Sequence, residues 1–226
     1  MLLAQKTIIV SDEMHEVCPQ FVGAAVYAEF VNTPHNTALW EEIDRYLAEY
    51  VKSQTVDTFK HIPAIEATRT VYRKCGKDPS RYRPSGEALI RRVLKGKGLY
   101  QIDTAVDLIN LASIAYGYSI GGFDYDKIEG DRIVLGIGRE SEPYEGIGRG
   151  MLNIEGLPVY RDALGGIGTP TSDHERTKID ASTCHLLALV NGYDGNADTV
   201  MKTAQMIQHL LRTCADSDGG QIATYQ

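Results

Sequence analysis

The stretch Phe21–Val31, FVGAAVYAEFV, is a long apolar run rich in residues that favour β-strands, and it predicts a buried strand. Between Leu39 and Tyr50, apolar residues then recur at helical spacing, and Asn36 or Thr37 can serve as the N-cap. The chain is therefore expected to pass from a buried strand into a helix.

Three further helices are predicted downstream, over Glu66–Lys74, Gly86–Leu94 and Asp103–Tyr116. The second is separated from the first by KDPSRYRPS, whose two prolines and two serines indicate a turn. Gly117 stands where a glycine would end the third helix.

From Ser119 to Asp194 glycines are frequent and short β-type runs alternate with turns. The runs are Arg132–Leu135, Leu157–Tyr160 and Cys184–Val190, and a helical stripe from Val200 to Leu211, with Asn196 as its cap, follows them. This pattern predicts an α+β fold in which a helix-rich N-terminal half packs around a strand-rich C-terminal half. Because no linker is visible, residues 1–226 are expected to form a single domain.

Composition gives the outer bounds. The 226 residues are 43% hydrophobic and 23% charged, as in ordinary soluble proteins. The first residues lack the pattern of a signal peptide, and no apolar run is long enough to cross a membrane. The four cysteines form no CxxC pair, which favours reduced thiols. We expect a cytoplasmic protein without a membrane segment.

Charge is distributed very unevenly. The net charge is −7, yet ten of the 23 basic residues lie between Arg69 and Lys97, against only Asp78 and Glu87. That segment has a net charge of +8 and the remainder −15. Such a chain can present one face that attracts phosphate groups while remaining acidic overall. Alternatively, these basic residues only face solvent on the surfaces of helices and bind no partner.

The standard catalytic and cofactor motifs are missing. Gly-Ile-Gly occurs three times, at Gly136–Gly138, Gly146–Gly148 and Gly166–Gly168, but the third glycine of a dinucleotide loop does not follow, and no GxxxxGK[ST] exists. The six histidines form no HxH or HExxH cluster, and there is no GxSxG elbow. We therefore predict no metal site and no cofactor.

One polar cluster stands out, GGIGTPTSDHERT at Gly165–Thr177. Ser172 and Glu175 have the spacing of a capping box, which predicts a helix with Ser172 as its N-cap and Glu175 at its third position. Alternatively, the unpaired amide groups at such a helix start face a ligand oxygen, and the two interpretations are compatible.

Four segments together resemble the B3/B4 domain, the tRNA-editing module of the phenylalanyl-tRNA synthetase beta subunit. They are Arg83-Pro84-Ser85, Val106–Asn110, Phe123–Gly130 and Val159–Asp162, which occur in the family's order between about Arg69 and Thr183. The resemblance implies an α+β editing fold with its core at about 69–194. It also implies a cleft for the aminoacylated 3′ end of tRNA, and ester hydrolysis of mischarged tRNA by a freestanding protein.

The resemblance also implies candidate residues. The chain departs from the family in two places. At Gly121-Gly122-Phe123-Asp124 the family has His-Ala-Phe-Asp, and at Thr169–Glu175 the family has a Met-Gly-Gly core. If a new acid–base pair replaces the family's groups, the candidate members are Asp173 and His174. The expected substrate-binding residues are Gly121, Asp124, Asp162, Ser172, Arg176 and Thr177. The expected tRNA-binding residues are Arg81, Arg83, Arg91, Arg92 and Lys95.

Two functional hypotheses remain open alongside each other. The first is an aminoacyl-tRNA deacylase that acts in trans on mischarged tRNA. The second is a non-catalytic module that binds tRNA, an amino acid or another small molecule. A small-molecule enzyme built on the same fold is a third, because a fold does not fix a function. The sequence specifies neither the amino acid, the tRNA nor the oligomeric state.

Overall fold

The predicted strand at Phe21–Val31 is confirmed, and it lies at the heart of a four-stranded antiparallel sheet. In the computed structural model, which describes residues 3–226, this strand is β2 (Val22–Glu29). Its neighbours are β9 (His185–Gly192) and β10 (Gln221–Tyr225), and β3 (Ile120–Asp124) follows β9 at the edge. We call this the central sheet.

A second sheet lies beside it, with strand order β1-β4-β7-β8. β1 runs parallel to β4, whereas the other pairs are antiparallel, and a two-stranded hairpin, β5–β6, extends from it. The strands are β1 (Thr7–Val10), β4 (Arg132–Ile137), β5 (Glu145–Gly146), β6 (Gly150–Met151), β7 (Pro158–Arg161) and β8 (Gly166–Gly168).

Six α-helices and three short 3-10 helices complete the described chain. They are α1 (Asp12–Val17), α2 (Thr37–Ser53), η1 (Phe59–His61), α3 (Pro63–Lys74), α4 (Ser85–Leu94), α5 (Thr104–Tyr116), η2 (Tyr125–Lys127), η3 (Glu175–Thr177) and α6 (Ala197–Cys214). The predicted helices and the Asn36 and Asn196 caps are confirmed, as is Gly117, which ends α5 with a φ of 79°. Within residues 3–226, no helix combines the length and apolar character needed to span a membrane.

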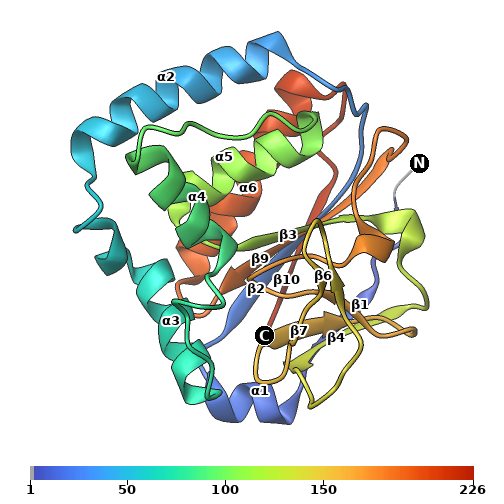
Figure 1. Cartoon of the computed structure of the whole chain (residues 1–226). Coiled ribbons are helices and arrows are strands. Elements are labelled where there is room, and N and C mark those ends of the chain that lie inside the picture. Colours follow the sequence, from blue (N-terminus) through green and yellow to red (C-terminus); the bar gives the residue numbers. More distant parts are fainter. Residues whose placement is uncertain (1–2) are drawn as a thin grey trace.

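Burial on both faces explains why β2 and β9 are almost wholly apolar. On β2, Val26 packs into a core shared with helices α2, α5 and α6, while its neighbours Ala25 and Tyr27 pack into a core shared with the second sheet. On β9, Ala188 and Leu189 divide in the same way. Since side chains alternate along a strand, the central sheet forms the middle of three layers (Figure 1).

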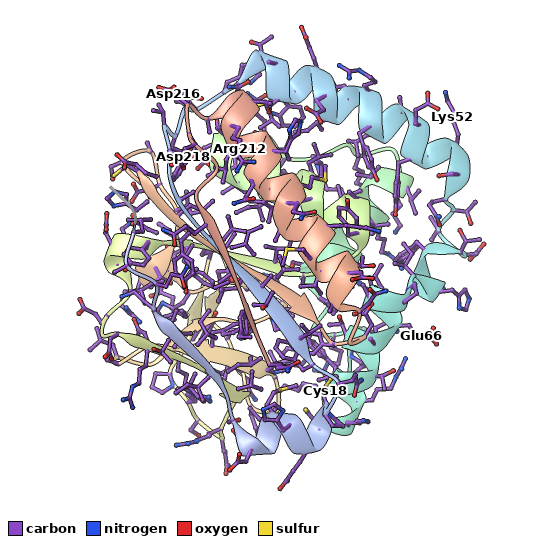
Figure 2. The ribbon with its side chains drawn as sticks, turned by 180° about the vertical axis from the view of Figure 1, so that it is seen from behind. Cys18, Lys52, Glu66, Arg212, Asp216 and Asp218 are labelled. Atoms are coloured by element: carbon purple, nitrogen blue, oxygen red, sulfur yellow. The ribbon has the colours of Figure 1, made fainter. Side chains whose placement is uncertain are left out.

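The long helix α6 covers the helical side of the central sheet, as Figure 2 shows from behind. Near its end, Arg212 donates from Nε to the carbonyl oxygen of Asp218 at 2.7 Å. This bond holds the connection that leads back into β10 (Figure 2).

One part of the fold prediction needs correction. The fold is mixed α+β, but its halves are not helix-rich and strand-rich, because helices and strands interleave along the chain. β1 and β2 belong to the first half, and α6, with 18 residues, belongs to the second. The core strands are contributed by both halves, since each sheet needs partners distant in sequence.

Candidate functional site

A cavity of about 290 Å³ opens where α4 and α5 meet β3 and the segment that follows β8. Its walls are mainly apolar and are formed by Leu89, Ile102, Val106, Ile109, Ile120 and Ile179. Ile102 and Ile147 line it while remaining 53% and 40% exposed, so they flank its mouth. The cavity therefore suits an apolar group that enters from solvent.

Asp173 is the acidic residue in the lining of this cavity. The amide of Gly122 donates to its Oδ2 at 3.1 Å, and no basic side chain of residues 3–226 pairs with it. Burial raises the pKa of Asp173 to about 7, although the Gly122 bond opposes the shift. A carboxyl group with this pKa exchanges a proton near neutrality, which is unusual outside functional sites.

The backbone holds Asp173 firmly. The segment after β8 turns at Thr169 and returns antiparallel, so that Asp173 pairs with Gly168. The amide of His174 donates to Ile167 at 2.8 Å, and that of Ile147 donates to Asp173 at 3.0 Å. Asp173 is thus fixed between β8 and the β5–β6 hairpin rather than on a loose loop.

Two glycines leave room for this arrangement. A Cβ on Gly168 would lie 2.5 Å from the Phe123 ring and 3.0 Å from Oδ1 of Asp173. A Cβ on Gly121 would lie 2.7 Å from the same ring. Gly168, the last glycine of the third Gly-Ile-Gly triplet, therefore allows the Phe123 ring and the Asp173 side chain to pack closely against the backbone.

The predicted capping box is wrong. Ser172 does not begin a helix, and its Oγ donates to the carbonyl oxygen of Asp173 at 3.2 Å. The helix that forms is the three-residue η3, and Nδ1 of His174 caps it by accepting from the amide of Arg176 at 3.0 Å. Glu175 instead accepts from the amide of Gly148 at 3.1 Å, which joins this segment to the β5–β6 hairpin.

His174 and Asp173 point in different directions, as consecutive residues of an extended segment do. His174 is not among the cavity-lining residues, and its ring packs edge-on against Tyr144 at 4.9 Å between centroids. Burial, followed by the charge of Arg176, lowers the pKa of His174. Of the two candidate acid–base residues, Asp173 lines the cavity and His174 does not.

The remaining predicted substrate-binding residues brace the site from outside the lining. Arg176 donates to both carboxylate oxygens of Asp162, at 2.8 and 2.9 Å. Burial would raise the pKa of Asp162, but the Arg176 bonds outweigh it and lower that pKa. Asp124 accepts from Thr183 at 2.8 Å and from Lys127 at 3.1 Å.

Gly121 and Thr177 also lie outside the cavity lining, and Thr177 is fully buried. Of the eight predicted catalytic and substrate-binding residues, the structure brings Ser172 and Asp173 to the cavity. Their roles stay predictions, and the contacts of the other six are those of a scaffold.

Sequence reasoning missed several lining residues, among them Asn110, Ser85 and Gly122. The side-chain amide of Asn110 has no hydrogen-bond partner in the described chain, so it is available to a ligand. All three belong to the segments that were compared with the B3/B4 domain. Assigning every residue of those segments to the site would have included them.

The predicted tRNA-binding residues lie just before α4, on it, or directly after it, and they differ in their pairing. Arg83 and Arg69 both pair with the buried Glu87, at 3.5 and 2.8 Å. Arg81, Arg91, Arg92 and Lys95 form no ion pair within residues 3–226. Their charge remains uncompensated, as an anion-binding face requires.

One group of potential metal ligands occurs elsewhere, formed by Asp126, Cys184 and His185. Their ligand atoms lie within 4.8 Å of one another, but Asp126 and Cys184 are exposed. His185 and Asp126 already form an ion pair at 2.7 Å.

Residues 67–215 of the chain match the B3/4 domain family. The structure is similar to an N-terminal fragment of the phenylalanyl-tRNA synthetase beta subunit from Pyrococcus horikoshii, at 14% identity and a TM-score of 0.50. The superposition covers 98% of this chain and 52% of that fragment, so the chain spans about half its length. No curated protein matches in sequence.

Proposed function

This chain belongs to the B3/4 domain family, and we propose that it binds tRNA and hydrolyses the ester that links a wrongly attached amino acid to the tRNA 3′ end. The main support for the proposal is the position of Asp173. Its carboxyl group lines a mainly apolar cavity, and its pKa is about 7. The cavity takes the amino-acid side chain, and its walls favour an apolar one.

The chemistry requires one water molecule. The ionised Asp173 accepts a proton from this water, whose oxygen then bonds to the ester carbonyl carbon. When the bond from that carbon to the ribose oxygen breaks, Asp173 returns the proton to the ribose oxygen. The products are a free amino acid and a tRNA with an intact hydroxyl group, and Asp173 regains its starting state.

Asn110 supports the developing negative charge in this scheme. Its amide has no partner within residues 3–226 and lines the same cavity, so it is available to donate to the carbonyl oxygen. A single donor of this kind contributes about 3 kcal/mol to lowering such a barrier. The Ser172 hydroxyl lies on the same lining and serves to position the ester.

A non-catalytic binding module is the second candidate. It is favoured by the position of His174, which leaves Asp173 without a second acid–base group of neutral pKa on the cavity. In that case Asp173 would bind a donor group of the ligand, and no bond would break.

The decisive experiment incubates the protein with a panel of mischarged tRNAs and follows loss of the ester. We expect hydrolysis to rise with pH through about 7 as Asp173 ionises. Asp173→Asn should lower kcat by about 10²–10⁴-fold and abolish that pH dependence, because it removes the base. His174→Ala should change kcat only a few-fold.

Loss of activity in His174→Ala but not in Asp173→Asn would reject the assignment of the base. If wild-type protein hydrolyses no ester yet retains tRNA on a filter in a salt-dependent way, the binding module stands. If it retains no tRNA at low salt, both tRNA hypotheses fail.

A further inference from the structure

We propose that Tyr100, with Arg92 stacked on its ring, is the site that binds the terminal nucleobase of the tRNA 3′ end. The inference rests on the proposed function, because it names how that substrate is seated at the cavity. Neither residue lines the cavity itself.

The pair has an unusual form. The Arg92 guanidinium lies over the Tyr100 ring, with Cζ 3.6 Å from its centroid, and Tyr100 is nevertheless 58% exposed. Two other tyrosines, Tyr82 and Tyr125, carry a lysine over their rings, but both are half-buried. An exposed aromatic ring backed by a guanidinium is a surface on which a base stacks well.

Arg92 has no competing partner. Within the described residues its side chain forms no hydrogen bond or ion pair, and its covered Nε atom is unsatisfied. By contrast, Arg69 and Arg83 on neighbouring elements are tied to Glu87. Arg92 therefore keeps its positive charge free for a nucleotide while it orders the Tyr100 ring.

The pair stands next to the mouth of the cavity. Tyr100 precedes Ile102, which flanks the mouth, by two residues, a span of at most about 7 Å. Arg92 follows the wall residue Leu89 by one turn of α4, so the two are neighbours on the helix surface.

This segment is also fixed in place. The carboxylate of Asp107 accepts from the amide of Ile102 at 3.0 Å and from the Trp40 indole at 2.7 Å. Ile102 is therefore fixed at the cavity, and the chain holds Tyr100 within two residues of it.

This spacing agrees with the chemistry of the ligand. In an aminoacylated tRNA the amino acid and the last base are attached to the same ribose, so a single sugar ring separates them. A side chain in the cavity would place the ribose at the mouth, beside Ile102, and the base beyond it. Tyr100 and Arg92, which are close in the chain to the lining residues Ile102 and Leu89, are the residues that we assign to that position.

The test measures binding of two uncharged RNA hairpins, one that ends in a single-stranded CCA and one that lacks only the terminal adenosine. Tyr100→Ala should weaken binding of the complete hairpin by about tenfold, as loss of one base–aromatic stack does. It should leave binding of the shortened hairpin unchanged. Tyr100→Phe should retain the wild-type preference. Leu164→Ala is the matched control, because Leu164 is 68% exposed and does not line the cavity.

Equal losses on both hairpins, or no loss on either, would overturn the proposal. Parallel ester-hydrolysis assays separate it from the proposed function. Adenosine-dependent binding without hydrolysis supports the stacking site and rejects the deacylase. Hydrolysis that is as fast in Tyr100→Ala as in wild type, with unchanged binding, retains the deacylase and rejects the stacking site.

Discussion

The burial of Asp173 without a basic partner makes the stability of the protein depend on pH. Its pKa is raised from an ordinary value of 3.8 to about 7, with burial as the main cause. Between these values the folded protein holds a proton that the unfolded chain releases. The protonated form therefore contributes stability that is complete below about pH 4 and is lost as the pH rises through 7.

We expect the free energy of unfolding of the wild-type protein to fall by roughly 2–4 kcal/mol between pH 4 and pH 8 from this group alone. Asp173→Asn should remove that part of the decline, so the variant should be more stable than wild type at pH 8. Urea unfolding at several pH values measures both curves. Parallel curves for variant and wild type would show that Asp173 keeps an ordinary pKa.

Sequence reasoning located Asp173 and Ser172 but assigned His174 to the same site. Both were candidates because the segment Thr169–Glu175 corresponds to the family's pocket region, and the expected capping box did not show which way each side chain points. The segment is extended instead, so His174 turns away from the cavity and caps η3. Nothing in the residue types distinguishes a three-residue helix from a longer one.

At the scale of elements, Glu87 ties α4, which contributes Ser85 and Leu89 to the cavity wall, to the neighbouring helix α3. It is 3% exposed, belongs to α4, and receives Arg69 of α3 at 2.8 and 3.0 Å. Arg83, just before α4, adds a longer contact at 3.5 Å. Removing the carboxylate would leave two cations without a partner and loosen α4 from α3.

Glu87→Ala should therefore lower the free energy of unfolding by about 3 kcal/mol, the lower end of the range for broken buried pairs, because both arginines retain some exposure. Glu66→Ala, an exposed residue on α3 (Figure 2), is the control and should change it by less than about 0.5 kcal/mol. Equal effects of the two substitutions in urea unfolding would exclude a structural role for the Glu87 pairs.

Elements with strong local signals were predicted well, and the others were missed for physical reasons. α2, α5 and α6 carry side-chain caps and apolar stripes, so their starts were predicted correctly, whereas the patterns for α2 and α6 end three residues before the helices do. β1, β8 and β10 are short and owe their conformation to partner strands far away in sequence. No local pattern predicts such a pairing.

For the whole molecule, part of the basic segment Arg69–Lys97 forms a positively charged surface at the end of α4. The α4 residues Arg91 and Arg92, together with Lys95 directly after the helix, lack acidic partners within residues 3–226. They lie beside a cavity whose wall includes Leu89 of the same helix. In the complex proposed above, phosphate groups near the tRNA 3′ end would contact this face, and the acidic remainder of the protein would face away from the RNA.

Charge reversal of Arg91 and Lys95 to Glu should weaken tRNA retention at low salt by at least tenfold. It should also reduce the slope of log affinity against log salt by about 2, one for each lost phosphate contact. Lys52→Glu with Lys202→Glu, on α2 and α6, changes the net charge equally and is the control. The same loss in both double variants would indicate a net-charge effect rather than a docking face.

Because β2 and β9 contribute side chains to both cores, the fold is expected to assemble slowly. Pairs such as Ile8 with Ile133 and Ala25 with Leu189 join distant parts of the chain, so long loops must close before either sheet is complete. Gly122 on β3 and Asp173 beside β8 belong to different sheets, and the hydrogen bond between them forms only when both sheets are in place. We expect the cavity to be among the last features to assemble during refolding and, in hydrogen exchange, among the first to open.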